Sequence, residues 1–360
     1  MNSLYIISPI AAFLLAYVLI PALRKIALPI GLVDKPNHRK VHANSVPLVG
    51  GIGIFLATTL TLTLAVPVDE KVLVYKNTFI GVVILLIMGI LDDRLDLRAS
   101  LKFAIQILLA HFIYSQGVKI ESLNGLFGIY SLSAWLQYFL TIVIITGVVN
   151  AFNLMDGIDG LAAGLALMGF GIFTFLAFVN GQFFTAVVFL TFIGALLAFL
   201  RYNLSQNKKI FMGDAGSLML GFVMVVSGLE LIQKAQGTNH ISAVTLGVIS
   251  VLFVPVFDAF RVFRRRIKAG KSPFHADKTH LHHLILMTGL KHKIASVLIV
   301  SLMTFISIIG YLSFQFAGLT LSITLMLLVF FIVTTLLQFN GKLNHWKHFI
   351  QEMEKPINLN

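Results

Sequence analysis

The feature that most limits what this chain can fold into is a series of apolar stretches, each about 20 residues long. A helix of that length crosses the hydrocarbon core of a bilayer and pairs all its backbone polar groups internally. We therefore predict an all-α polytopic membrane protein with about eleven transmembrane helices. The predicted spans cover residues 3–23, 46–66, 76–92, 100–117, 133–151, 159–180, 182–202, 214–233, 241–261, 294–315 and 318–339.

The composition excludes an ordinary soluble domain. Apolar residues make up 58% of the chain and charged residues only 12%, whereas soluble domains carry about 25% charged residues. The chain has no cysteine, which excludes a disulfide framework, a thiolate metal site and a cysteine nucleophile.

The distribution of positive charge predicts the orientation of the chain. With the N-terminus outside and eleven spans, 23 of the 27 Lys and Arg residues fall on the inner side or in the C-terminal tail. Cytoplasmic loops carry such an excess of basic residues. The prediction therefore places the N-terminus outside and the C-terminus in the cytoplasm.

Acidic residues gather at the predicted inner face, where they are costly unless they are paired, hydrated or bound to a metal. Nine of the 15 acids lie there, at Asp34, Asp92, Asp93, Asp96, Asp156, Asp159, Asp214, Asp258 and Asp277. The adjacent pair Asp92 and Asp93 suits Mg²⁺, which prefers oxygen ligands. A charged, solvated helix end explains this pair about equally well.

Two further loops carry acids with two possible interpretations each. Asn153, Asp156 and Asp159 are spaced by three and would form one polar stripe if they were helical. The alternative is a turn, because Asp-Gly pairs are common in turns. Asp214 stands at the start of a predicted span, where a structural N-cap is the more ordinary role. A helix N-terminus also favours phosphate.

The loop after the ninth predicted span combines a basic run, which includes Arg265 and Arg266, with His280, His282 and His283. A basic run beside a membrane is often only a topology signal or a lipid contact. Three histidines in four positions indicate metal binding, acid–base chemistry or phosphate contact. Oxygen ligands elsewhere favour Mg²⁺ or Mn²⁺ over Zn²⁺.

These loops share one face of one membrane, which indicates a single active site where a soluble substrate meets a lipid. A carrier usually places its polar residues near the middle of the membrane, so a lipid-phosphate transporter or scaffold is kept as the non-enzyme alternative. Residues 1–340 are interpreted as one integral-membrane catalytic domain and 341–360 as a short polar cytoplasmic tail.

The motifs of these loops, in their order along the chain, resemble the polyprenyl-phosphate N-acetylhexosamine-1-phosphate transferase family. The loop forms Val-Pro-Leu-Val-Gly-Gly and His-Leu-His-His resemble its WecA/TagO-like branch, which uses GlcNAc-1-phosphate, more than the phospho-MurNAc-pentapeptide translocase branch. The motifs that carry the resemblance are residues 34–36, 39–42, 46–51, 92–93, 153–161, 211–217, 272–274 and 280–283.

The resemblance implies a reaction in which a UDP-N-acetylhexosamine and undecaprenyl phosphate give a lipid diphosphate sugar and UMP. It also implies Mg²⁺, with Mn²⁺ as an alternative, and a location in the bacterial cytoplasmic (inner) membrane, with the active site on the cytoplasmic face of an enzyme of cell-envelope glycan synthesis. A homodimer is a further implication, and no nucleic acid is expected as a partner. Open alternatives are a translocase-like enzyme and a transferase for another UDP-amino sugar.

The same resemblance assigns roles to individual residues by motif position. Asp92, Asp93 and Asp214 would hold the metal. The catalytic group would comprise Asp92, Asp93, Asn153, Asp156, His280, His282 and His283. The substrate-binding group would comprise Lys40, His42, Asp159, Asn203, Phe211, Arg265 and Arg266, with Phe211 stacked on uracil.

Overall fold

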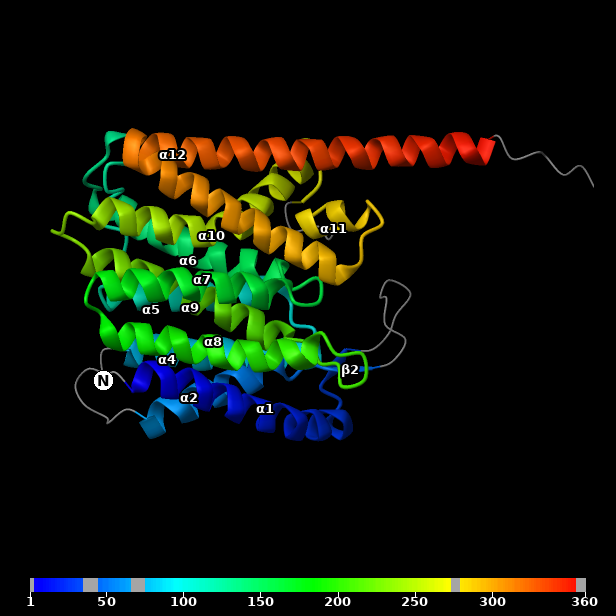
Figure 1. The fold of residues 1–360 in the computed structure, drawn as a ribbon, viewed down its shortest axis with the longest axis horizontal. Helices are drawn as coiled ribbons and strands as arrows, with labels where there is room; N and C mark the ends of the chain where they lie inside the picture. Colours follow the sequence, from blue (N-terminus) through cyan, green and yellow to red (C-terminus); the bar gives the residue numbers. More distant parts are fainter. Residues whose placement is uncertain (1–2, 35–44, 66–74, 273–278, 354–360) are drawn as a thin grey trace, which may run out of the picture.

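A computed structural model describes residues 3–34, 45–65, 75–272 and 279–353 of the chain, with side chains up to residue 340 except at residue 65. Helices dominate these ranges, and two strands of two residues each pair in an antiparallel sheet (Figure 1). The elements are α1 Leu4–Ile30, β1 Val33–Asp34, β2 Val46–Pro47, α2 Gly50–Ala65, α4 Lys76–Leu95, α5 Ala99–Ser115, the 3₁₀ helix η1 Leu126–Gly128, α6 Ala134–Leu154, α7 Leu161–Val179, α8 Phe183–Asn203, α9 Gly213–Lys234, α10 Ile241–Lys268, α11 Leu281–Leu286 and α12 His292–Met353.

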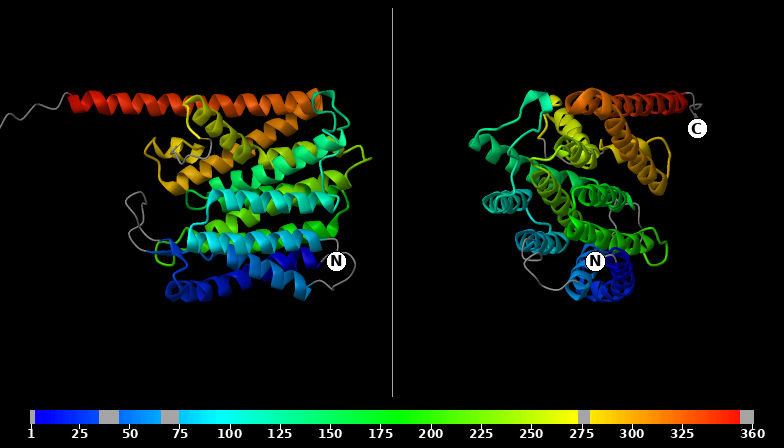
Figure 2. Two further views of the ribbon diagram at one scale, coloured as in Figure 1. Left: turned by 180° about the vertical axis from the view of Figure 1, so that it is seen from behind. Right: turned by 60° about the vertical axis from the view of Figure 1, so that its left-hand side comes forward.

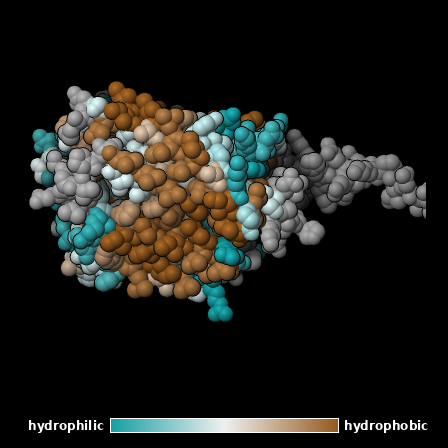
Figure 3. All heavy atoms as spheres, turned by 90° about the horizontal axis from the view of Figure 1, so that it is seen from below, coloured by the Kyte–Doolittle hydropathy of each residue, from teal (hydrophilic) through white to brown (hydrophobic). Residues whose placement is uncertain are grey.

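The helices form a bundle with the surface expected of a protein embedded in lipid. An apolar band lies between two polar ends of the molecule (Figure 3). Within the described residues, seven helices are long and apolar enough to cross a bilayer, namely α1, α6, α7, α8, α9, α10 and α12. The chain is therefore an all-α polytopic membrane protein, as the sequence predicted.

Helix α9 forms the centre of the bundle. It is buried over almost its whole length and packs against α4 on one side and α6 on the other. Small residues permit these close contacts: a side chain at Gly221 would run into Phe152 of α6, and one at Gly89 of α4 would run into Ala215. α1 and α2 lie at one flank of the bundle and α12 at the opposite flank (Figure 2).

Helix α12 contains two arms that turn back on each other. The backbone of Gly318 leaves helical geometry, with φ 70° and ψ −178°, which is a conformation that glycine adopts readily. The two arms coincide with the predicted spans 294–315 and 318–339. The second arm continues to Met353 and extends beyond the end of the neighbouring helices, so the helix includes much of the segment predicted to be a tail (Figure 1).

A short hairpin positions the start of α2. β1 pairs with β2, and the residue after β2 forms a bridge to Phe211 in the loop before α9. The Phe211 N–H donates to the carbonyl of Pro47 at 2.9 Å, and the Gly50 N–H donates to the carbonyl of Phe211 at 2.9 Å. A side chain at Gly51 would collide with the backbone of Gly216. The Pro47–Gly51 motif thus holds the N-terminus of α2 directly against that of α9.

Candidate active site

Asp92 and Asp93 end helix α4 and point to different partners, as expected for adjacent helical residues. Asp92 is 6% exposed. Its Oδ2 lies 2.5 Å from the Lys102 amine of α5, and its Oδ1 accepts the backbone N–H of Leu97 at 2.9 Å. Asp96 falls outside the helix, with φ 51° as the residue after its last turn.

Asp93 caps the N-terminus of α9 from the neighbouring helix. Its carboxylate accepts the backbone N–H of Asp214 at 2.9 Å and that of Ala215 at 3.4 Å. Gly213 permits this contact, because its φ is 75° and a side chain there would lie 2.5 Å from Asp93 Oδ2. The alternative in which Asp214 is the N-cap of its own helix is wrong, since the N-cap position is Met212, Asp214 lies in the first turn, and Asp93 accepts the free backbone N–H groups.

The Asp214 side chain is instead directed toward α6 and α5. Asn153 donates its amide to Asp214 Oδ1 at 2.9 Å and to Ser217 Oγ at 2.8 Å. The Lys102 amine lies 3.8 Å from Asp214 Oδ2. Lys102 thus sits between the carboxylates of Asp92 and Asp214, and Asn153 fixes the second of them. The Asp214 side chain remains 36% exposed.

Asp156 lies in the turn between α6 and α7, and no described basic side chain pairs with it. The predicted helical stripe is wrong, because α6 ends at Leu154 and only Asn153 of the three polar residues is helical. No described residue donates a hydrogen bond to the Asp156 carboxylate. Burial, followed by the nearby carboxylates of Asp214 and Asp93, raises the pKa of Asp156 well above its ordinary value.

Among the described residues, no group of three or more histidine or acidic side chains is arranged to hold a metal ion by itself, so a divalent cation here would be held by one or two carboxylates together with substrate phosphates. Asp156 lies close to Asp214, which accepts a bond from Asn153 and lies 3.8 Å from the Lys102 amine. Oxygen ligands that repel one another are held together at low cost when a cation lies between them. Asp93 uses both oxygens as a helix cap, so Asp214 and Asp156 offer the freer ligands.

A second group of residues joins the α6–α7 turn to the α8–α9 loop. Asp159 accepts a bond from the Lys209 amine at 2.7 Å, and that amine lies 5.2 Å from the centre of the Phe211 ring. Asn203 lies beneath them and is 4% exposed. Its amide accepts the Gly160 N–H at 2.7 Å and donates to the Ile210 carbonyl at 2.9 Å. Asn203 therefore ties the two loops together, whereas Asp159 and Phe211 lie closer to the surface.

The three histidines have different surroundings. His280 and His282 are buried, and His283 is half-buried. The His280 ring bonds to Asp258 of α10 at 2.9 Å. His282 packs on Gly157, where an added side chain would lie 2.6 Å from its Nε2. Burial, together with the nearby His283 and His280, lowers the pKa of His282 to about 3, so this ring is neutral at physiological pH.

Four predicted substrate-binding residues remain, two arginines in the described part of the chain and two residues outside it. Arg265 is exposed, whereas Arg266 is 5% exposed and lies 5.8 Å from the Phe263 ring. Lys40 and His42 fall in residues 35–44, which lie outside the described residues. Their assignment stays a prediction.

An apolar groove ends beside the polar cluster. The groove has a volume of about 590 Å³ and lies between α6, α9 and α10. Asn150, Ala151 and Leu154 from the last turns of α6 line one end, together with Phe103 and Phe263. Because Asn153 follows on the same turns of α6, the apolar groove and the carboxylates are neighbours.

The structure also brings in three residues to which the sequence assigned no role: Lys102, Lys209 and Asp258. Two of the three had a weak signal in the sequence. Lys102 and Asp258 are charges within predicted spans, where a charge indicates a partner or a function. Lys209 lies in a loop with Lys208, and nothing in the sequence separates the two.

The fold and the site together define a multi-pass membrane protein that places carboxylates, histidines and lysines at the end of an apolar groove. The profile of glycosyl transferase family 4 matches residues 76–232. A Bacillus subtilis protein described as a probable undecaprenyl-phosphate N-acetylglucosaminyl 1-phosphate transferase is 34% identical over 99% of this chain and 98% of its own length.

Two proteins described as undecaprenyl-phosphate alpha-N-acetylglucosaminyl 1-phosphate transferases are also similar. The one from Yersinia pestis is 33% identical over 83% of this chain and 81% of its own length. The one from Escherichia coli (strain K12) is 32% identical over 90% and 88%. The chain belongs to glycosyl transferase family 4, which confirms the resemblance drawn from its motifs.

Proposed function

We propose that this protein transfers an N-acetylhexosamine 1-phosphate, most simply GlcNAc-1-phosphate, from the UDP-sugar to undecaprenyl phosphate and releases UMP. The descriptions of the similar proteins support this substrate pair. The observation that carries the proposal is the carboxylate cluster at the end of an apolar groove. A reaction between a water-soluble donor and a lipid phosphate needs both features in one place.

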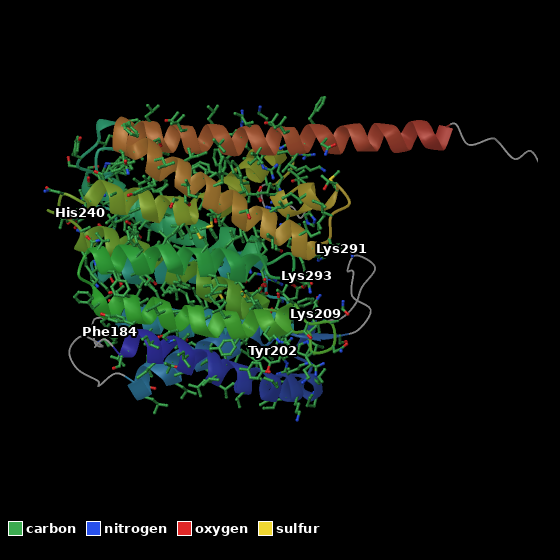
Figure 4. The ribbon with its side chains drawn as sticks, viewed as in Figure 1. Phe184, Tyr202, Lys209, His240, Lys291 and Lys293 are labelled. Atoms are coloured by element: carbon green, nitrogen blue, oxygen red, sulfur yellow. The ribbon has the colours of Figure 1, made fainter. Side chains whose placement is uncertain are left out.

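We place the site on the cytoplasmic face of the bacterial inner membrane, with eleven spans and the N-terminus outside. In support, Lys209, Lys291 and Lys293 lie at one end of the bundle, and His240 and Phe184 lie at the other (Figure 4). The positive-inside rule assigns the lysine-rich end to the cytoplasm. The two arms of α12 together with α1, α2 and α4 to α10 account for eleven segments.

Mg²⁺, or Mn²⁺ in its place, is the proposed metal. Asp214 and Asp156 would hold it, with Asp92 and Asp93 in the surrounding layer that fixes Lys102 and the start of α9. When bound, such an ion neutralises the diphosphate of the donor and stabilises the leaving UMP. Burial, and after it the repulsion from the neighbouring carboxylates, raises the pKa of Asp156, and this repulsion is the physical reason to expect a cation.

The proposed reaction is a single displacement. An oxygen of the lipid phosphate forms a bond to the sugar-bearing phosphorus of the donor, and the bond between this phosphorus and the oxygen bridging to the nucleoside phosphate breaks. The bridging oxygen and its electron pair leave with UMP. Asp92 and Asp93 both have their carboxylate oxygens engaged by donors, which favours direct attack over a covalent aspartyl-phosphate intermediate.

Lys102 and the loop residues would supply positive charge and positioning. The Lys102 amine lies between two carboxylates and would face the incoming phosphate of either substrate. Phe211 would stack on uracil once Lys209 leaves its ring face, and Asp159 would accept a bond from the nucleotide.

The test is UMP release by the purified protein from a panel of UDP-sugars with undecaprenyl phosphate, with and without EDTA. We expect metal-dependent UMP release, greatest with UDP-GlcNAc, and its loss in Asp214→Asn and in Asp92→Asn. Glu230→Gln is a matched control, because Glu230 is a buried acid of α9 at the opposite end from the site. Lipid binding without UMP release from any donor would support the transporter or scaffold alternative instead.

A further inference from the structure

Asp258 is a carboxylate for which the proposed reaction has so far no use. It lies in α10 and is fully buried. The Arg261 guanidinium donates to its Oδ1 at 2.6 Å, and the Leu281 N–H donates to it at 3.1 Å. The His280 ring lies 2.9 Å from its Oδ2. A buried acid in a membrane helix is costly and is generally kept for a function or by close partners.

The contact with Asp258 sets which nitrogen of His280 carries a proton. An ionised carboxylate only accepts hydrogen bonds, so the facing nitrogen, Nδ1, must be the donor. The other nitrogen, Nε2, is buried and has no hydrogen-bond partner among the described residues. Asp258 therefore leaves Nε2 as the ring atom that is free to accept a bond from, or exchange a proton with, a bound group.

A row of rings leads from Asp258 to the carboxylate cluster. The His280 and His282 rings are nearly parallel, with an interplanar angle of 6° and centroids 6.0 Å apart. His282 in turn lies against Gly157, the residue after Asp156. The orientation of His280 is thus coupled through direct packing to the turn that holds Asp156.

We propose that Asp258 is a positioning residue that holds His280 with Nδ1 protonated, leaves the buried Nε2 as its proton-accepting nitrogen, and fixes the ring against His282 beside the turn of Asp156. This inference rests on the proposed transferase function for its substrate. Arg261 supports the arrangement, because it donates both to Asp258 and to the carbonyl of Thr279, the residue before His280. Asp258 therefore holds the His280 ring directly, and Arg261 holds the backbone just before His280.

Kinetics of three variants test the coupling: Asp258→Asn, His280→Gln and the double variant. Asp258→Asn keeps the shape and one acceptor but removes the charge. We expect kcat to fall about ten- to a hundred-fold, the range found when a residue that orients a functional histidine is lost, with KM for the UDP-sugar nearly unchanged. The double variant should be no slower than His280→Gln, because both act through one ring. Multiplying losses in the double variant would overturn the proposal.

A second measurement does not depend on turnover or on a variant of Asp258. ¹⁵N NMR of histidine-labelled wild-type protein, with the His280 signal identified by its loss in His280→Gln, reports which ring nitrogen carries a proton. We expect Nδ1 to be protonated, and an unprotonated Nδ1 would overturn the proposal even if Asp258→Asn does not fold. Wild-type protein that releases no UMP would refute the proposed function, and the NMR result would still decide the Asp258–His280 contact.

Discussion

Lys102 offers a quantitative test of how the site is held together. Its amine lies 2.5 Å from Asp92 and 3.8 Å from Asp214, and the Asp92 side chain is only 3% exposed. Lys102→Met retains an apolar stem of similar length and removes the charge. Breaking a buried ion pair leaves an uncompensated charge and costs about 3 to 5 kcal/mol. Because the Lys102 side chain is 26% exposed, we expect the lower end, about 3 kcal/mol.

The double variant Asp92→Asn/Lys102→Met separates stability from activity. It contains no unpaired charge at this pair, so most of the lost stability should return. UMP release should remain absent, because the charge that faces the phosphates is still missing. Thermal melting in detergent, measured beside UMP release on the same preparations, gives both quantities.

Lys119→Met is the matched control for this experiment. Its partner Glu121 lies 3.1 Å away in the loop between α5 and η1, where both side chains are about one-third exposed. Exposed pairs contribute about 0 to 1 kcal/mol, so this variant should melt near the wild type. A Lys102→Met protein as stable as the control, or a double variant no more stable than the single, would refute the reasoning.

Three further expectations concern the surrounding loops. Asn203→Ala removes two buried hydrogen bonds to the backbone, and each partner left unpaired costs about 1 to 3 kcal/mol. We therefore expect a clearly lower melting temperature. If Asn203 only contacted the nucleotide, the variant would raise KM and leave the melting temperature unchanged. Gly213→Ala forces a left-handed backbone on alanine at about 1 to 2 kcal/mol and displaces the Asp93 cap, so both melting temperature and UMP release should fall; unchanged values would contradict the cap. His282 has a pKa of about 3 in the fold, against about 6.5 in an unfolded chain. Its contribution to stability is therefore complete above pH 6.5 and is lost as the pH falls toward 3. His282→Gln should flatten the drop in melting temperature between pH 7 and pH 5, and an equal drop in both proteins would refute this.

Much of the fold could be predicted from the sequence because its main determinant is local. The length and apolarity of a segment decide whether it spans a bilayer, and these are properties of consecutive residues. Positive charges in the loops predict the orientation in the same way, and the orientation stays a prediction. The two arms of α12, separated at Gly318, follow from this pattern. The motifs also identified which loops would carry polar residues.

The sequence could not predict which role each acidic residue of those loops has. Asp93 and Asp214 are both acids near helix ends, and only the packing of α4 against α9 decides that Asp93 caps the helix while Asp214 faces Asn153. The helical stripe failed because α6 ends before Asp156. Residues spaced by three lie on one face of a helix only where the helix includes all of them.

The sequence by itself determined that this is a multi-pass helical membrane protein of the sugar-phosphate transferase type, with carboxylates and histidines gathered in the loops on one side. Only the tertiary structure decided that Lys102 lies between Asp92 and Asp214 and that Asp258 orients His280. Span formation depends on the free energy of placing consecutive residues in lipid. Ion pairs and hydrogen bonds between distant residues depend instead on distances of about 3 Å, which only helix packing sets.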